Sequence, residues 1–405
     1  MSDTSLIASS PSAKSLPLSA KMIFTLATAG GLSVASIYYS QPMLGLMGNG
    51  VGASEASIGM VPMLTQAGYA LGILLLLPLG DRYDRRAIIL LKSLFLTLAL
   101  LLCSLVPSIH DLLFASLVTG VAATMTQDIV PATAALAPEA QRGKTVGTVM
   151  SGILIGILLS RVVSGFVAEY YGWRVMYQLA AFSIALIGIA LWRILPRFTP
   201  GARLGYGTLL LSMYHLWQRY PTLRRAAIAQ GLLSMAFSAF WSTLAIMLHD
   251  TYHLGSAVAG AFGLAGAAGA LAAPLAGAIA DKSGPSRVTQ LGSGIVMLSF
   301  AAMFLLPLLS TNAQLVLIVL SAIGFDLGVQ ATLVSHQSIV FGLEPAARGR
   351  LNAVLFTIMF IGMAVGSSLG SIALQSGGWS AVVLVATLAA AASLWVRLRS
   401  HHLHN

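Results

Sequence analysis

Three ionisable side chains lie deep inside the long apolar segments of this sequence, and they are Asp128, Arg161 and Asp326. A charged group at bilayer depth is costly, and by default it marks a functional site. Asp326 lies about twelve residues from either end of its apolar segment, 314–339. A carboxylate buried there loses hydration when it is charged, so it could bind a proton near neutral pH. Asp326 is therefore the first candidate for proton coupling.

The neighbours of Asp326 on the helical wheel are also polar. Gln330 and Gln337 follow it at separations of 4 and 11 residues, which places all three on one helix face. We interpret this stripe as part of the wall of a watery central cavity, with both glutamines as substrate-binding candidates. The alternative is that these side chains hydrogen-bond between packed helices.

Asp128 is the second candidate for proton coupling. It lies seven residues from the C-terminal end of its segment, 111–135, which is ~10 Å deep at ~1.5 Å per residue. It shares a helix face with Thr124, Gln127 and Pro131. The proline should kink the helix and free a backbone carbonyl. Gln127 is thus a further substrate-binding candidate.

Arg161 is a candidate for attracting an anionic or polar substrate group, or for tuning a carboxylate. It lies ~24 Å from the same side of the membrane, ~14 Å deeper than Asp128, so the sequence leaves open whether the two interact. Its side chain points away from the face of Gly152 and Gly156, which suits close helix packing. The alternative is a side chain that snorkels near the outer interface.

Aromatic and amide side chains supply the remaining substrate-binding candidates. They are Tyr38, Tyr39 and Gln41 in the first apolar segment and Trp241 in the seventh. Aromatic rings with a few amides suit an amphipathic organic substrate. Each ring taken alone is more typical of packing or of anchoring at the membrane interface than of substrate binding. Only their convergence would define a site.

The elements that position these residues follow from composition. Of 405 residues, 57% are hydrophobic and only 8% are charged, whereas a soluble domain carries about 25% charged residues. The mean hydropathy of +0.86 agrees with this imbalance. A soluble enzyme and a disordered protein are excluded, and an integral membrane protein remains. The net charge of +10 does not indicate nucleic-acid binding, because the basic residues are spread between apolar stretches.

A window of ~20 apolar residues predicts twelve membrane-spanning helices. They cover 22–47, 57–79, 87–106, 111–135, 145–168, 175–195, 226–248, 256–280, 287–309, 314–339, 350–374 and 379–397. The predicted organisation is a tail (1–21), a six-helix bundle (22–195), a linker (196–225), a second six-helix bundle (226–397) and a tail (398–405). With these spans, 20 of the 22 Lys and Arg residues fall on one side of the membrane. The two exceptions are Arg161, within a span, and Arg174, on the other side. This asymmetry predicts that both termini and the linker are cytoplasmic. Lys92 is counted among the charges on that side.

A repeat relates the two bundles. A shift of 206 residues aligns 142–144 (Arg-Gly-Lys) with 348–350 (Arg-Gly-Arg) and 172–173 with 378–379 (both Gly-Trp). A shift of 200 residues places Asp81 on Asp281, in the loops after the second and eighth spans. The fold class predicted is therefore all-α, with twelve helices in two pseudo-symmetric parallel repeats.

The loop after the second span carries a recognisable motif. Residues 80–86 read Gly-Asp-Arg-Tyr-Asp-Arg-Arg, which resembles the G-x-L-A-D-R-x-G-R-R/K signature of the major facilitator superfamily, with Leu77 and Asp84 in place of two glycines. Segments 152–156 and 171–174 resemble the fifth span of its drug:proton antiporter branch, without that branch's Gly-Pro pair. The resemblance implies a conformational gate formed by Asp81, Arg82, Arg85 and Arg86. The alternative is that these charges act only in topology.

Together these features predict a secondary active transporter that works by alternating access. The leading hypothesis is proton-coupled efflux of a small organic compound, and the alternative is proton-coupled uptake of an organic anion. A non-transporting membrane receptor is a weaker alternative. No nucleophile–base pair or nucleotide-binding loop indicates an enzyme, and no cofactor is expected. The eight histidines are expected at ends or in loops, so no metal site is predicted. We expect a monomer in the inner membrane whose partners are the substrate, the proton and lipid.

Overall fold

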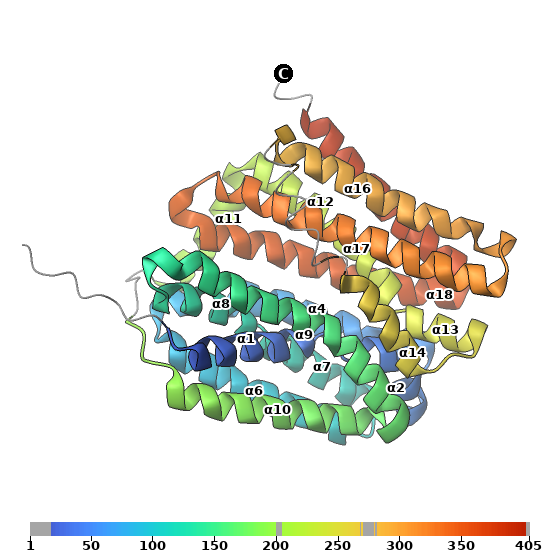
Figure 1. The fold of residues 1–405 in the computed structure, drawn as a ribbon, viewed down its shortest axis with the longest axis horizontal. Coiled ribbons are helices and arrows are strands. Elements are labelled where there is room, and N and C mark those ends of the chain that lie inside the picture. Colours follow the sequence, from blue (N-terminus) through green and yellow to red (C-terminus); the bar gives the residue numbers. More distant parts are fainter. Residues whose placement is uncertain (1–17, 200–204, 268, 270–278, 280–281, 402–405) are drawn as a thin grey trace, which may run out of the picture.

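The computed structural model describes residues 18–199, 205–267, 269, 279 and 282–401. This part of the chain is built from helices and contains no strand. Two groups of helices, one from each half of the sequence, lie against each other and run along the long axis of the molecule (Figure 1). The predicted all-α membrane fold is confirmed.

The first half contains helices that match the first six predicted segments. They are α1 (Ala20–Ala35), α2 (Leu44–Val51), α3 (Glu55–Ile58), α4 (Met60–Leu76), α5 (Leu79–Arg82), α6 (Arg85–Leu105), α7 (Ile109–Ala123), α8 (Met125–Leu136), α9 (Arg142–Tyr171) and α10 (Trp173–Ile194). The first segment is not one continuous helix, because turns and the 3-10 helix η1 (Gln41–Met43) separate α1 from α2. Pro42 lies inside η1, where it cannot donate a backbone hydrogen bond. The break therefore allows buried side chains such as Tyr38 and Gln41 to point in directions that a continuous helix would not give them.

The second half follows the same plan. Its helices are α12 (Pro221–Trp241), α13 (Leu244–Tyr252), α14 (Ser256–Ala261), η3 (Phe262–Gly266), α16 (Pro285–Ala302), η4 (Met303–Leu308), α17 (Thr311–Phe341) and α18 (Arg348–His401). Gly378, with φ of 67°, interrupts α18 between the last two predicted spans. Of the eighth predicted span, 256–280, most of the second half lies outside the described residues.

Among the residues described, nine helices are long and apolar enough to cross a membrane. One of them, Pro345–Arg399, includes two predicted spans, and the shorter apolar helices Ala20–Ala35 and Ser256–Gly266 lie in two others. Each of the twelve predicted segments therefore contains an apolar helix.

Glycine seams hold equivalent helices together in the two halves. A Cβ on Gly156 of α9 would lie 2.3 Å from the carbonyl oxygen of Gly31 in α1. In the second half, a Cβ on Gly362 of α18 would lie 2.1 Å from the carbonyl oxygen of Gly231 in α12. Gly31 and Gly231 are 200 residues apart, and Gly156 and Gly362 are 206 apart. The same close backbone approach therefore recurs at the shifts that the sequence repeat gives.

Helix α11 (Tyr206–Arg219) connects the halves. Its apolar face, formed by Leu209, Met213 and Leu216, is buried, and the helix packs against α12 and α18. At its start the Tyr206 hydroxyl donates to the carbonyl of Leu75 in α4, 2.7 Å away. The linker therefore packs on the second half and contacts the first at one end.

Candidate functional site

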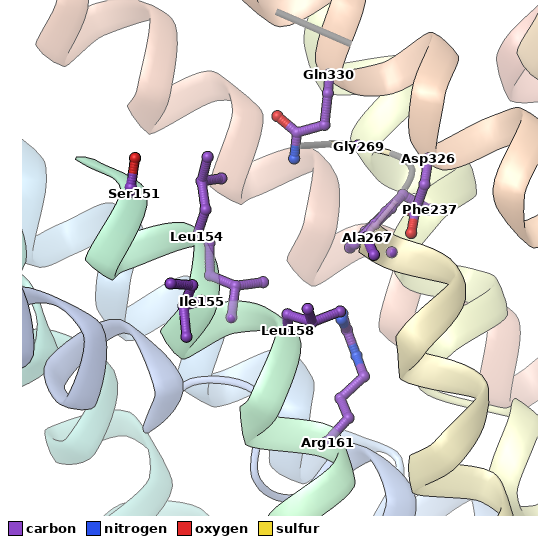
Figure 2. Close-up of a pocket in the computed structure, with 12 residues that line it drawn as sticks. Ser151, Leu154, Ile155, Leu158, Arg161, Phe237, Ala267, Gly269, Asp326 and Gln330 are labelled. Carbon is purple, nitrogen blue, oxygen red and sulfur yellow. The ribbon is translucent and has the colours of Figure 1, made fainter. Parts of the chain in front are cut away.

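A cavity of about 230 Å³ lies between the two halves. Helix α9 forms one wall, and Phe237 of α12, the segment around Gly266, and α17 form the opposite wall (Figure 2). Its lining is mainly apolar, with a few polar side chains. The lining residues are Ser151, Leu154, Ile155, Ile157, Leu158, Arg161, Phe237, Gly266, Ala267, Gly269, Asp326 and Gln330.

Arg161 extends from α9 toward the opposite wall (Figure 2) and is only 2% exposed. Its Nε donates to Oε1 of Gln41 at 2.8 Å. The guanidinium carbon lies 4.3 Å from the ring centre of Trp241, 4.9 Å from that of Tyr38 and 5.6 Å from that of Phe237. Such contacts stabilise a desolvated cation by up to ~2 kcal/mol. The side chain therefore lies inside the protein and not at the outer interface.

Local backbone features explain how Arg161 is held. Gln41 lies in the break between α1 and α2, so its amide can reach α9. Gly260 and Gly263 come from the second half. A Cβ on Gly260 would lie 2.3 Å from the Arg161 carbonyl oxygen, and one on Gly263 would lie 2.9 Å from the Arg161 Cβ. Residues from both halves therefore fix this one arginine.

Asp326 lies on α17, across the cavity from Arg161, and is 4% exposed. Within the described part of the chain, its Oδ1 has no hydrogen-bond partner and no ion pair within 4.0 Å joins it to Arg161. The Arg161 cation and the Asp326 carboxylate still attract each other across the cavity, and the Trp241 side chain also interacts with the Asp326 carboxylate. Gln330, one turn further along α17, lines the same cavity. The structure thus brings Asp326, Gln330 and Arg161 to one site.

Asp128 lies away from the cavity, next to Lys92, which the count of topogenic charges did not indicate to be buried. Lys92 is 5% exposed, and its Nζ lies 2.5 Å from Oδ2 of Asp128. Asp128 is also close to the motif loop, since a Cβ on Gly80 would lie 3.2 Å from its Oδ1. Asp128 does not line the cavity, and among the described residues it forms no hydrogen bond or ion pair with Arg161. A signal was available, because Lys92 lies inside the predicted third span.

The other amide and tyrosine candidates divide between the site and its surroundings. Tyr38 and Gln41 contact Arg161 directly. Gln127 donates to the hydroxyl of Tyr69 at 3.1 Å, Tyr39 is buried at 5% exposure, and Gln337 donates to Asn352 at 3.0 Å. These last three candidates do not line the cavity, so the polar stripe predicted on α17 reaches it at Asp326 and Gln330 but not at Gln337.

The motif loop is partly helical. Asp81 of α5 pairs with Arg85 of α6 at 3.4 Å, Arg86 donates to the carbonyl of Trp192 at 2.6 Å, and the guanidinium of Arg82 lies 5.6 Å from the ring of Tyr83. Asp84, which the sequence showed only as a departure from the family signature, accepts from the backbone of Arg86 at 3.0 Å and of Phe198 at 2.9 Å. It therefore caps α6 and attaches the start of the linker.

The expectation that the histidines lie at ends or in loops was wrong for His336. It is fully buried within α17, and its Nδ1 lies 2.9 Å from Oε1 of Gln230 in α12. Its position inside a predicted span was the available signal. Within the residues described, no group of three or more His, Cys, Asp or Glu side chains is arranged to hold a metal ion.

A bundle of apolar helices in two repeats, around a central cavity that is lined mainly by apolar residues and holds two buried charges, is the architecture of a multi-pass membrane transporter. Residues 26–342 match the model of the Major Facilitator Superfamily, and this chain belongs to that family. It is 36% identical to "Uncharacterized transporter YgaY" of Escherichia coli O157:H7, over 95% of this chain and 97% of that protein. It is 24% identical to the multidrug resistance protein MdtG of Serratia proteamaculans, over 76% and 75% of the two chains. The fold is similar to that of the nucleoside transporter NupG, with a TM-score of 0.74 at 16% identity over 93% and 99% of the chains.

Proposed function

We propose that this chain is a secondary active transporter that exports a small organic compound in exchange for protons by alternating access. The observation that carries the proposal is the buried Oδ1 of Asp326, which has no hydrogen-bond partner in the described part of the chain and belongs to the cavity wall. A carboxylate in that position can hold a proton or accept a hydrogen bond from a substrate. Because the proton and the substrate compete for the same carboxylate, each can displace the other, as exchange requires.

Contacts at one end of the molecule support alternating access. Ser367 of the second half donates to the carbonyl of Gly59 at 3.2 Å, and a Cβ on Gly165 of the first half would lie 2.3 Å from the carbonyl oxygen of Ser256. The halves are thus closed beyond Arg161. From Arg161 the cavity lining runs along α9 to Ser151, ~15 Å toward the other end.

Orientation is part of the proposal. The distribution of Lys and Arg supports cytoplasmic termini in the inner membrane. With that orientation the closed end is external and the cavity extends toward the cytoplasm, where a compound destined for export would enter. We propose a monomer, because each half closes on the other within a single chain.

Uptake of an organic anion is the second candidate function, and Arg161 favours it. Its Nη2 is buried and, within the described residues, has no hydrogen-bond partner. An anion bound there would repel an ionised Asp326, so it would bind better when Asp326 is protonated. Anion and proton would then move together, whereas a substrate that donates to Asp326 would exchange with the proton. The two candidates therefore predict opposite proton movements.

The test uses the full chain in proteoliposomes with an imposed pH gradient and a pH-sensitive dye inside. The compounds tested are small amphipathic molecules with cationic, neutral or anionic head groups. Export by exchange predicts that compound and protons cross in opposite directions, and anion uptake predicts that they cross together. Asp326→Asn should abolish proton movement but retain binding, while the control Leu320→Met, at a 59% exposed site on the same helix, should behave as wild type. Normal coupling in Asp326→Asn would contradict the role of Asp326 in both candidates and move the proton site to Asp128.

A further inference from the structure

Two of the residues that line the cavity carry a buried polar atom without a hydrogen-bond partner among the described residues, a donor on one wall and an acceptor on the other. Nη2 of Arg161 and Oδ1 of Asp326 are both buried, and neither has a hydrogen-bond partner among the residues that the structure describes. The hydrogen bond from Nε of Arg161 to Gln41 holds the guanidinium on its own side of the cavity. Nη2 of Arg161 therefore does not pair with Asp326. Buried polar atoms are nearly always hydrogen-bonded, and each unsatisfied one costs ~1–3 kcal/mol, more for a charged group. This pair is therefore suited to a ligand that supplies both missing partners.

The rest of the cavity is suited to an apolar body. Leu154, Ile155 and Leu158 project from α9 on one side of it, and Phe237 lies on the other (Figure 2). The volume of about 230 Å³ is below the ~300–1,000 Å³ of pockets that hold drug-sized ligands. A single ring or a short branched chain therefore suits this space better than a large polycyclic compound.

We propose that the substrate is a small amphipathic molecule whose polar head group is neutral overall and offers an acceptor beside a donor, bridging Arg161 and Asp326. This inference rests on the proposed transport function and names the substrate class for the same cavity. A primary carboxamide meets the requirement without charge, and the adjacent ammonium and carboxylate of an amino acid meet it as a zwitterion.

The charges of the two residues explain why the head group is neutral. Arg161 and an ionised Asp326 sum to zero, so a head group with a single charge satisfies one of them and leaves the other buried without a partner. An uncompensated buried charge is strongly unfavourable. A carboxylate alone would also face Asp326, and an ammonium alone would face Arg161. Both singly charged head groups should therefore bind worse than the neutral ones.

Four compounds with one apolar body test the proposal: 3-phenylpropanamide, zwitterionic phenylalanine, 3-phenylpropanoate and 3-phenylpropylammonium. Binding to the purified full chain in detergent is measured by calorimetry at pH 8, without a gradient. We expect the amide, the zwitterion or both to bind at least tenfold more tightly than either singly charged compound. Which of the two binds tells whether the head group is uncharged or carries both charges.

Two variants should reverse the preference in opposite senses. Asp326→Asn leaves Arg161 as the net charge of the site, so 3-phenylpropanoate should become the tightest ligand. Arg161→Gln leaves Asp326, so 3-phenylpropylammonium should become the tightest. Val163→Leu, a conservative change at a 44% exposed site on α9, should keep the wild-type order. A merely unfolded variant would bind none of the four, which size-exclusion chromatography would reveal beforehand.

Three results would overturn the proposal: tightest binding of a singly charged compound to wild type, no detectable binding of any of the four, or no reversal in the two folded variants. These measurements need no proton movement. Loss of proton coupling with the head-group order intact would therefore contradict the proposed exchange alone, and a wrong order with intact coupling would contradict the substrate class alone.

Discussion

The ion pair between Lys92 of α6 and Asp128 of α8 offers a quantitative test of what holds the first half together. The two side chains are 6% and 0% exposed, and Nζ lies 2.5 Å from Oδ2. The other oxygen of Asp128 has no hydrogen-bond partner within the described residues. The pair is therefore almost completely desolvated, and the loss of either partner leaves a charge without compensation.

Asp128→Asn and Lys92→Met should lower the free energy of unfolding by different amounts. Breaking a buried pair by removal of one partner costs ~3–5 kcal/mol. Asp128→Asn leaves the Lys92 ammonium against a neutral amide and should fall at the upper end of this range. Lys92→Met leaves Asp128 near Arg85, a second cation that acts on it, and should fall at the lower end. The double variant Lys92→Met/Asp128→Leu removes both charges and should lie within ~1 kcal/mol of wild type, because apolar replacements of such pairs are often neutral or stabilising.

Thermal unfolding of the four proteins in one detergent, at one scan rate, completes the double-mutant cycle. Leu94→Val, at a 55% exposed site on α6, controls for nonspecific effects of substitution on that helix. The expected result is two clearly destabilised single variants and a double variant close to wild type. Additive destabilisation in the double variant would refute the pairing. Undiminished stability of Asp128→Asn with loss of proton coupling would instead identify Asp128 as the proton carrier.

Three further predictions concern packing, the gate and the linker. Gly156→Ala should greatly reduce the yield of folded protein on size-exclusion chromatography, whereas Gly147→Ala, where a Cβ would meet nothing within 4 Å, should not. Asp81→Asn should slow turnover in proteoliposomes but change substrate affinity by no more than a few-fold, and a large loss of affinity at normal turnover would contradict a gating role. The Tyr220 hydroxyl donates to Glu344 at 2.8 Å, which raises the pKa of Tyr220, so this contact stabilises the fold below the tyrosine's ordinary pKa and is lost as pH rises through the raised one. Thermal stability should show that alkaline step in wild type and not in Tyr220→Phe.

Hydropathy and residue counts predicted where each helix runs but not which side chains meet. Depth along a helix follows from a rise of ~1.5 Å per residue, so the sequence alone could place Asp326 and Arg161 well inside their segments, and both side chains are buried. Contacts also depend on how each helix is rotated and tilted against its neighbours, which the sequence of one chain does not encode in any simple pattern. Lys92 shows the difference, because counting it as a topogenic charge gave no indication that its neighbour in space is Asp128.

The break in the first helix was equally hard to predict. The sequence indicated one apolar segment over 22–47, and Pro42 alone does not say where a helix ends, because neighbouring helices often compensate for proline in a membrane. The break nevertheless decides the site, since it places Gln41 and Tyr38 against Arg161. Local hydropathy does not register such a feature, because the residues on both sides of the break are apolar.

The sequence repeat accounts for how the helices pack in each half, but it does not extend to the charged residues of the cavity. At a shift of 206 residues, Arg161 corresponds to Ser367, and Asp326 corresponds to Gly120. Ser367 donates to the Gly59 carbonyl in the contact between the halves, and a Cβ on Gly120 would lie 1.9 Å from the Thr65 carbonyl oxygen. The positions equivalent to the two charges thus serve helix packing. Because the cation belongs to one half and the carboxylate to the other, any rocking of the halves changes the distance between them. A conformational change that altered this distance would alter the affinity of Asp326 for a proton, as the proposed coupling requires.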